Sequence, residues 1–364
     1  MDTSASNRET IPAFDRSFFD SDLTFTRIGG GSLGGKAQGL IQIRKTLAGL
    51  RDGEAFRKVD LAIPRLTVVG TEIFDQFLEM NDLLPVAFSE SSDQRIAHAF
   101  QKGDLPSAFL GDLRGLVEHV HTPLAVRSSS MLEDALERPF AGVYETKMIP
   151  NNQPSPEARF QRLVEAVKLI FASTFFRNAR DYREATGDGQ ETEKMGVIVQ
   201  EVLGGQHGHR FYPHLSLVAR SYNYYPTGKA QPEEGVVSLA LGLGKTIVDG
   251  GVCWSYCPAY PQAPPPFGSP RQIFQETQSR FWAVNMGPPP AYDPIAETEY
   301  LVEGDLADAE YDGTLKHLVS TYDGAGDRFI PGMGHPGPRV LDFSPLLKLK
   351  LFSFNQMVTE ILEA

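Results

Sequence analysis

Apolar residues recur with helical spacing in some stretches of the chain and form short continuous or alternating runs in others. Leucine and isoleucine share one side of a helix in residues 37–50, whereas residues 194–203 are a continuous apolar run typical of a buried strand. The first half of the chain is therefore predicted to contain strands at residues 22–28, 61–69, 124–126 and 194–203 and helices at residues 37–50, 72–80, 92–101, 107–121 and 157–183.

The second half has fewer clear elements. We predict strands at residues 215–224, 235–241 and 339–343, a helix at 346–362, proline-rich loops at 258–270 and 287–294, and an exposed acidic stretch at 297–312. This mixture predicts an α+β fold with two to three subdomains, because 364 residues are too many for one simple core. We expect a flexible lead-in at residues 1–21, N-terminal subdomains at 22–203 and a C-terminal subdomain at 204–364.

The composition is that of an ordinary globular protein, with 41% hydrophobic and 22% charged residues. A net charge of -12 without a basic run argues against a nucleic-acid surface. No apolar run is long enough to span a membrane, and the polar N-terminus lacks the features of a signal peptide, so we expect a cytoplasmic protein without a membrane partner. Cys253 and Cys257 lack further cysteines or suitably spaced histidines, so we expect reduced thiols.

A glycine-rich segment, Gly29-Gly-Gly-Ser-Leu-Gly-Gly-Lys36, separates the first predicted strand from the helix at residues 37–50. Glycines let the backbone approach a ligand, a helix start presents N–H groups, and a lysine supplies positive charge. The segment is therefore a candidate phosphate site, with a flexible loop before a helix as the structural alternative. It nearly fits the P-loop pattern, but Ala37 stands where the magnesium-binding Ser or Thr is required.

A second candidate is Leu124-Ala-Val-Arg-Ser-Ser-Ser130, followed by Glu133 and Asp134, because it changes abruptly from apolar to polar. Arg127 can offer a planar fork of donors to a phosphate, and the serines can add hydroxyl and amide groups. The structural alternative is a strand that ends at Val126, followed by a serine-rich cap of a helix whose first turn carries the two acids.

Two further groups carry weaker signals. Residues 242–251 form a second glycine-rich turn with one lysine, but Leu239 stands where a P-loop needs its first glycine. His207, His209 and His214 are close in sequence, yet no carboxylate or cysteine set completes a metal site. We therefore expect surface or loop histidines and leave the metal ligands unassigned.

Several blocks match one known family in order and spacing. They are Gly34-Gly-Lys-Ala-Gln-Gly-Leu40, Ala125-Val-Arg-Ser-Ser-Ser130 with Glu133-Asp134, Phe140-Ala-Gly142, Val197-Ile-Val-Gln-Glu-Val202 and, more loosely, Gly242-Leu-Gly244. Through these blocks, which span most of residues 25–250, the chain resembles the N-terminal nucleotide-binding domain shared by phosphoenolpyruvate synthase and pyruvate phosphate dikinase. The resemblance implies an ATP-grasp-like fold with the nucleotide in a cleft between subdomains.

The resemblance also implies roles for the matching residues. Lys36 and Arg127 would contact the ATP phosphates and act in catalysis, with Gly34, Gly35, Ser128, Ser129 and Ser130 around the triphosphate and Gln200, Glu201 and Val202 at the adenine. Magnesium would help to neutralise the phosphates. The phosphoryl group would pass to a histidine on a separate phosphohistidine domain and then to pyruvate in a barrel domain.

The chain departs from the family at two places. Lys245 follows Gly-Leu-Gly where the family usually carries an acid, and it could neutralise phosphate instead. The family's last strand, whose acidic pair holds Mg²⁺, should follow a helix like residues 346–362, so we expect the magnesium ligands to be missing and no transfer by this chain unaided. The alternative functions are a non-catalytic nucleotide-sensing or regulatory module of the same fold and a P-loop hydrolase.

Overall fold

The computed structural model describes residues 11–50, 53–131, 142–186, 193–263 and 268–364. The chain divides into two compact units. Unit 1 comprises Met1–Gln42, Ile63–Val202 and Pro289–Tyr300, and unit 2 comprises Ile43–Ala62, Leu203–Pro288 and Leu301–Ala364. Both units mix helices with sheets, which confirms the predicted α+β class. The predicted subdomain boundary between residues 203 and 204 stays a prediction.

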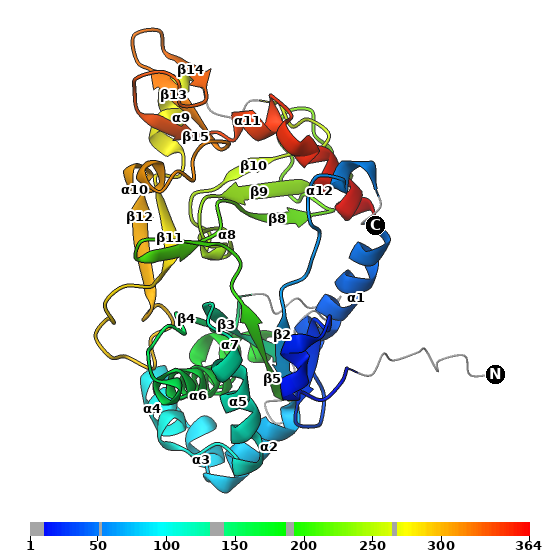
Figure 1. Ribbon diagram of the computed structural model, residues 1–364, viewed down its shortest axis with the longest axis vertical. Helices are drawn as coiled ribbons and strands as arrows, with labels where there is room; N and C mark the ends of the chain where they lie inside the picture. Colours follow the sequence, from blue (N-terminus) through cyan, green and yellow to red (C-terminus); the bar gives the residue numbers. More distant parts are fainter. Residues whose placement is uncertain (1–10, 51–52, 132–141, 187–192, 264–267) are drawn as a thin grey trace, which may run out of the picture. The chain divides into compact units, whose positions relative to one another are not determined.

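A five-stranded sheet forms the centre of unit 1, in the order β1-β2-β5-β3-β4. Figure 1 labels four of its strands, β2 to β5. β1 and β2 are parallel, and every other neighbouring pair is antiparallel. The strands are β1 (Phe25–Ile28), β2 (Leu66–Val69), β3 (Leu124–Ser130), β4 (Thr146–Ile149) and β5 (Met195–Glu201). The helices are η1 (Arg16–Asp20), α1 (Gly35–Leu50, which continues into unit 2), α2 (Thr71–Met80), α3 (Leu84–Ala87), α4 (Asp93–Lys102), α5 (Ser107–His119), α6 (Pro156–Ser173) and α7 (Arg177–Thr186).

The core of unit 1 is built around α6, which packs on β3, β4, α4 and α5. Its sequence is apolar along most of its length, so it can be buried on several sides. The single helix predicted at residues 157–183 is wrong, because the chain leaves helical geometry between Ser173 and Arg177. This break places buried Phe175 among the aromatic rings of Phe74, Phe88 and Phe100.

Residues 11–21 pack on unit 1, although the sequence predicted a flexible lead-in there. Ile11, Phe14 and Phe18 are buried, and the Phe14 amide donates to the carbonyl of Arg27 on β1. Burying these three apolar side chains favours an ordered segment.

Unit 2 contains three sheets, with strand orders β10-β9-β8, β12-β11-β7-β6 and β14-β13-β15. The strands are β6 (Gly205–His207), β7 (Arg210–Tyr212), β8 (Ser216–Arg220), β9 (Val236–Ala240), β10 (Trp254–Tyr256), β11 (Arg280–Asn285), β12 (Leu301–Asp305), β13 (Val319–Asp323), β14 (Arg328–Pro331) and β15 (Arg339–Leu341). The helices are η2 (Glu54–Phe56), η4 (Pro232–Glu234), α8 (Lys245–Val248), α9 (Pro270–Glu276), α10 (Leu306–Tyr311), α11 (Ser344–Leu347), η5 (Leu351–Ser353) and α12 (Phe354–Glu363). None of the helices in the described ranges is long and apolar enough to cross a membrane.

The acidic stretch at residues 297–312 is not exposed throughout, because Glu299 forms a buried ion pair with Lys147 of β4. Lys147 Nζ lies 2.6 Å from Glu299 Oε2, and both side chains are only 1% exposed. The same ammonium group donates to the carbonyls of Pro294, at 2.9 Å, and Asp293, at 3.3 Å. Burial lowers the pKa of Lys147, while Glu299 opposes that shift. These contacts hold residues 289–300 on unit 1.

We predict that Glu299→Gln destabilises the fold by about 3–5 kcal/mol, because it leaves the Lys147 ammonium buried without its counter-charge. Urea unfolding at neutral pH measures the loss. Asp75→Asn is the control, because the Asp75–Lys194 pair is 43% and 50% exposed and should contribute less than about 1 kcal/mol. Equal small losses for the two variants would contradict the role given to the Lys147 pair.

Candidate functional site

The polar segment after Val126 continues β3 as a strand. Arg127 pairs with Ile198 of β5, and the register runs on to Ser130 opposite Met195. The prediction that the strand ends at Val126 is therefore wrong, because the β5 ladder satisfies the backbone of the polar residues as well. Ser128, Ser129 and Ser130 are buried, and Arg127 is half-buried. Glu133, Asp134, Phe140 and Ala141 lie outside the described residues.

Ser129 joins β3 to the start of α1. Its Oγ donates to the Leu33 carbonyl at 2.7 Å and accepts from the Ala37 amide at 3.0 Å. The Ala37 amide belongs to the first turn of α1, where amides have no acceptor within the helix, so the serine caps the helix from a neighbouring strand. We call this pair of hydrogen bonds the Ser129 latch.

Gly34 is required where the loop meets the latch. Its φ is +79°, and a Cβ at this position would lie 1.8 Å from the Ser129 carbonyl oxygen. No side chain fits at that distance, and the left-handed backbone itself favours glycine. Gly34 thus allows the loop backbone to lie directly against β3.

Three amides of the glycine-rich segment are bound within unit 1. Gly30 N–H donates to Glu72 Oε2 at 2.8 Å, and Ser32 N–H donates to Thr71 Oγ1 at 3.0 Å. Gly34 N–H donates to Ser32 Oγ at 3.2 Å. A P-loop needs its amides to face the phosphates, so this arrangement does not favour the P-loop alternative. Thr71 and Glu72 were not predicted from the sequence, where their only signal is their position at the start of a helix.

Lys36 contacts β3 at Ser128, the residue that follows Arg127 in the chain. Lys36, in the first turn of α1, donates from Nζ to Ser128 Oγ over 3.2 Å. Arg127, the neighbouring residue on β3, donates from Nη1 to Gln200 Oε1 over 3.4 Å. Lysine, arginine and hydroxyl groups are residue types that suit the charge and the oxygen atoms of a polyphosphate.

The residues predicted to meet the adenine lie at the end of β5. Glu201 Oε2 accepts from Thr122 Oγ1 at 2.7 Å, and the Glu201 amide donates to the Arg65 carbonyl. The Val202 amide donates to the Pro123 carbonyl at 2.8 Å. An adenine at this strand end would therefore have to use groups other than these two amides. The adenine-binding role of Gln200, Glu201 and Val202 stays a prediction.

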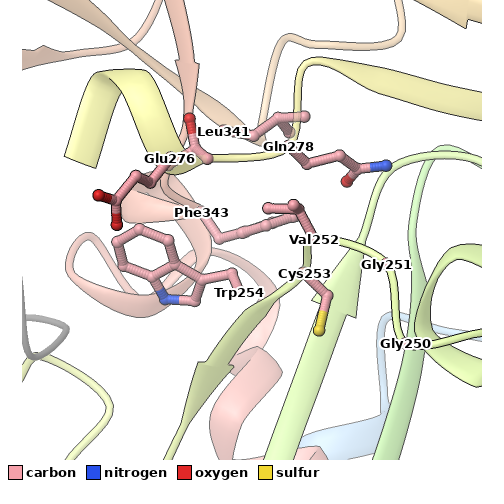
Figure 2. A pocket seen from close by; sticks show the side chains of 10 residues that line it. Gly250, Gly251, Val252, Cys253, Trp254, Glu276, Gln278, Leu341 and Phe343 are labelled. Carbon is pink, nitrogen blue, oxygen red and sulfur yellow. The ribbon is translucent and has the colours of Figure 1, made fainter. Parts of the chain in front are cut away.

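Lys245 belongs to unit 2, so the structure does not bring it together with Lys36 and Arg127 within one unit. It begins α8, and its Nζ lies 2.7 Å from Asp249 Oδ2. The end of the same glycine-rich turn, Gly250 and Gly251, lines a pocket of about 510 Å³ with Trp254 and Glu276, as Figure 2 shows. Lys245 is not among the described residues that line this pocket.

The described ranges contain no group of three or more His, Cys, Asp or Glu side chains that could hold a metal ion. The rings of His207 and His214 do approach each other, with centroids 5.8 Å apart. Magnesium usually needs only one or two carboxylates besides the nucleotide phosphates. We assign no magnesium ligand and derive no step through the metal.

A family model and several curated proteins match parts of this chain. The model of the family described as pyruvate phosphate dikinase, AMP/ATP-binding domain, matches residues 31–257, which include every candidate residue named above from Gly34 to Lys245. Phosphoenolpyruvate synthase of Aeropyrum pernix is 29% identical over 143 residues, which are 39% of this chain and 15% of the relative.

Two further relatives are named as phosphotransferases. An uncharacterised phosphotransferase of Bacillus subtilis is 26% identical over 195 residues, 54% of this chain and 21% of the relative. Rifampicin phosphotransferase of Streptomyces sviceus is 29% identical over 134 residues, 35% of this chain and 13% of the relative. The matched part thus spans 13–21% of the length of these curated relatives.

We predict that Gly34→Ala loses more stability than the roughly 1–3 kcal/mol that a left-handed backbone costs a non-glycine residue, because its Cβ also overlaps the Ser129 carbonyl. Gly49→Ala, in the same helix α1, is the matched control. No atom lies within 4 Å of its added Cβ, so it should gain about 0.4–1 kcal/mol. Thermal unfolding of both variants checks the pair, and equal effects would contradict the close approach at Gly34.

Proposed function

The chain belongs to the family of pyruvate phosphate dikinase AMP/ATP-binding domains, and on this premise we propose that it binds ATP for phosphoryl transfer. Lys36 and Arg127 contact the phosphates, and Ser128, Ser129 and Ser130 line them. The phosphoryl group passes to a histidine of a separate domain and from there to pyruvate, as in a dikinase of phosphoenolpyruvate synthase type.

The hydrogen bond from Lys36 to Ser128, the residue next to Arg127 in the chain, carries the proposal. The lysine is held at Ser128 by a 3.2 Å hydrogen bond, and the arginine is the next residue along β3. Lys36 belongs to α1 and Ser128 to β3, so their contact depends on the fold and not on sequence proximity. Phosphoryl transfer depends mostly on positioning and on electrostatic stabilisation of the phosphates, and two such cations supply both.

The Ser129 latch supports the same proposal, because it positions the backbone that carries Lys36. It fixes the first turn of α1 against β3, and therefore fixes where Lys36 starts relative to Arg127. The positive end of the α1 dipole lies at this turn and adds to the attraction for phosphate. A site whose cations are held in place before the nucleotide arrives loses less conformational entropy on binding.

Transfer of the phosphoryl group to an acceptor is a separate part of the proposal from ATP binding. The name of one relative specifies phosphoenolpyruvate synthesis and that of another specifies rifampicin as the acceptor. We extend the former to this chain because the blocks at residues 34–40, 125–130 and 197–202 resemble that family. Magnesium would accompany the ATP as a counter-ion of its phosphates.

We predict that Arg127→Ala weakens ATP binding about tenfold to a hundredfold, because a charged hydrogen bond to phosphate contributes roughly 1.5–3 kcal/mol. Isothermal titration calorimetry with ATP, with and without Mg²⁺, measures the change. Arg177→Ala is the matched control, because this arginine of α7 is 79% exposed and pairs only with Asp181 of the same helix among the described residues.

The control variant should bind ATP like the unchanged chain, and both variants should keep its melting temperature within a few degrees. An Arg127→Ala variant that binds ATP normally would overturn the proposed site. A variant that loses melting temperature without a selective ligand defect would mean that Arg127 is a structural residue.

A further inference from the structure

Unit 2 contains a second pocket, of about 940 Å³, beside the end of β10. Its described lining consists of residues 227–230, 255–257 and 259–263 together with Lys350. This volume is typical of small-molecule sites, which span roughly 300–1,000 Å³. No residue that we assign to ATP is among the described lining residues, so the pocket is not part of the proposed nucleotide site.

The walls of this pocket are tight turns that are already closed by hydrogen bonds. The turn at residues 227–230 is closed by the Ala230 amide, which donates to the Thr227 carbonyl. Two successive turns form another part of the lining, with Tyr260 N–H donating to the Cys257 carbonyl and Ala263 N–H donating to the Tyr260 carbonyl. Asn355 of α12 donates to the Pro258 carbonyl at 3.0 Å and so ties this wall to the helix. The pocket is therefore formed without a ligand, as small-molecule sites usually are.

The charged side chains of the lining are both cations. Lys229 and Lys350 line the pocket, and its described lining contains no carboxylate. Neither ammonium group makes a hydrogen bond or ion pair with the described part of the chain, although the protein carries a net charge of -12. The carboxylate of Glu234, which is not among the described lining residues, lies 3.9 Å from Cys257 Sγ and accepts from the Gln231 amide at 2.8 Å.

We propose that this pocket binds a small phosphorylated molecule, with the phosphate held between Lys229 and Lys350. Lysine is a good partner for phosphate because its compact charge needs no particular approach direction. The rest of the ligand meets hydrogen-bonding groups of Thr227, Ser255 and Gln262 and the ring of Tyr260, which is 39% exposed. The site is a second anion site of the chain and does not depend on the proposed transfer reaction.

Lysine labelling in the full chain tests the proposal residue by residue. Pyridoxal phosphate carries a phosphate and forms an imine with a lysine amine, with loss of water, and borohydride reduction makes the link permanent. We expect mass spectrometry to find Lys229 or Lys350 labelled several-fold more than Lys58, an exposed lysine of unit 2. Inorganic pyrophosphate should protect these two lysines, and should still protect them in the Arg127→Ala variant. Labelling equal to that of Lys58, or no protection, overturns the proposal.

Variants give an independent readout. Lys229→Ala and Lys350→Ala should each weaken binding of pyridoxal phosphate about tenfold, as expected for the loss of one charged contact. Lys58→Ala is the control and should not change it. Both pocket variants should keep the melting temperature, because neither ammonium group contacts the described residues. Unchanged binding by both pocket variants would contradict the site, even if the nucleotide site proves correct.

Discussion

The Ser129 latch is the interaction on which the arrangement of the candidate site depends. One hydroxyl group, on a buried residue of β3, accepts from the first turn of α1 and donates to the loop before it. Gly34 makes this possible, because its missing side chain lets the loop lie against the Ser129 carbonyl. Lys36 follows two residues later and reaches Ser128 on the same strand. The position of the lysine is therefore set by backbone contacts that need no ligand.

The glycine-rich segment is also held by contacts that need no ligand. Glycines in such a segment usually indicate a loop that wraps around phosphates. Here the amides of Gly30, Ser32 and Gly34 are bound by α2 and by the loop itself. What remains for a nucleotide is the start of α1 and the cations and hydroxyls of Lys36 and β3.

Helices and strands with a clear local pattern could be predicted from the sequence. Contacts between residues that lie far apart in the chain could not. Periodicity placed α1, α2, α4 and α5 and the central strand β5 within a few residues. It ended β3 too early, because three consecutive serines resemble a cap unless their pairing with β5 is known. It also missed β10 to β14, short strands in a region rich in proline and glycine. The acidic stretch at residues 297–312 looked solvated because Lys147, the partner of Glu299, lies 152 positions away in the chain.

Hydrogen exchange of the full chain with and without ATP tests the central claim most directly. The first amides of α1, including those of Gly35 and Lys36, have no acceptor within the helix, so their exchange should respond to a bound phosphate. We predict that ATP slows exchange at the start of α1 and at the polar end of β3. If ATP binds by calorimetry while exchange at both segments is unchanged, the phosphates lie elsewhere and the account of Lys36 and Arg127 is wrong.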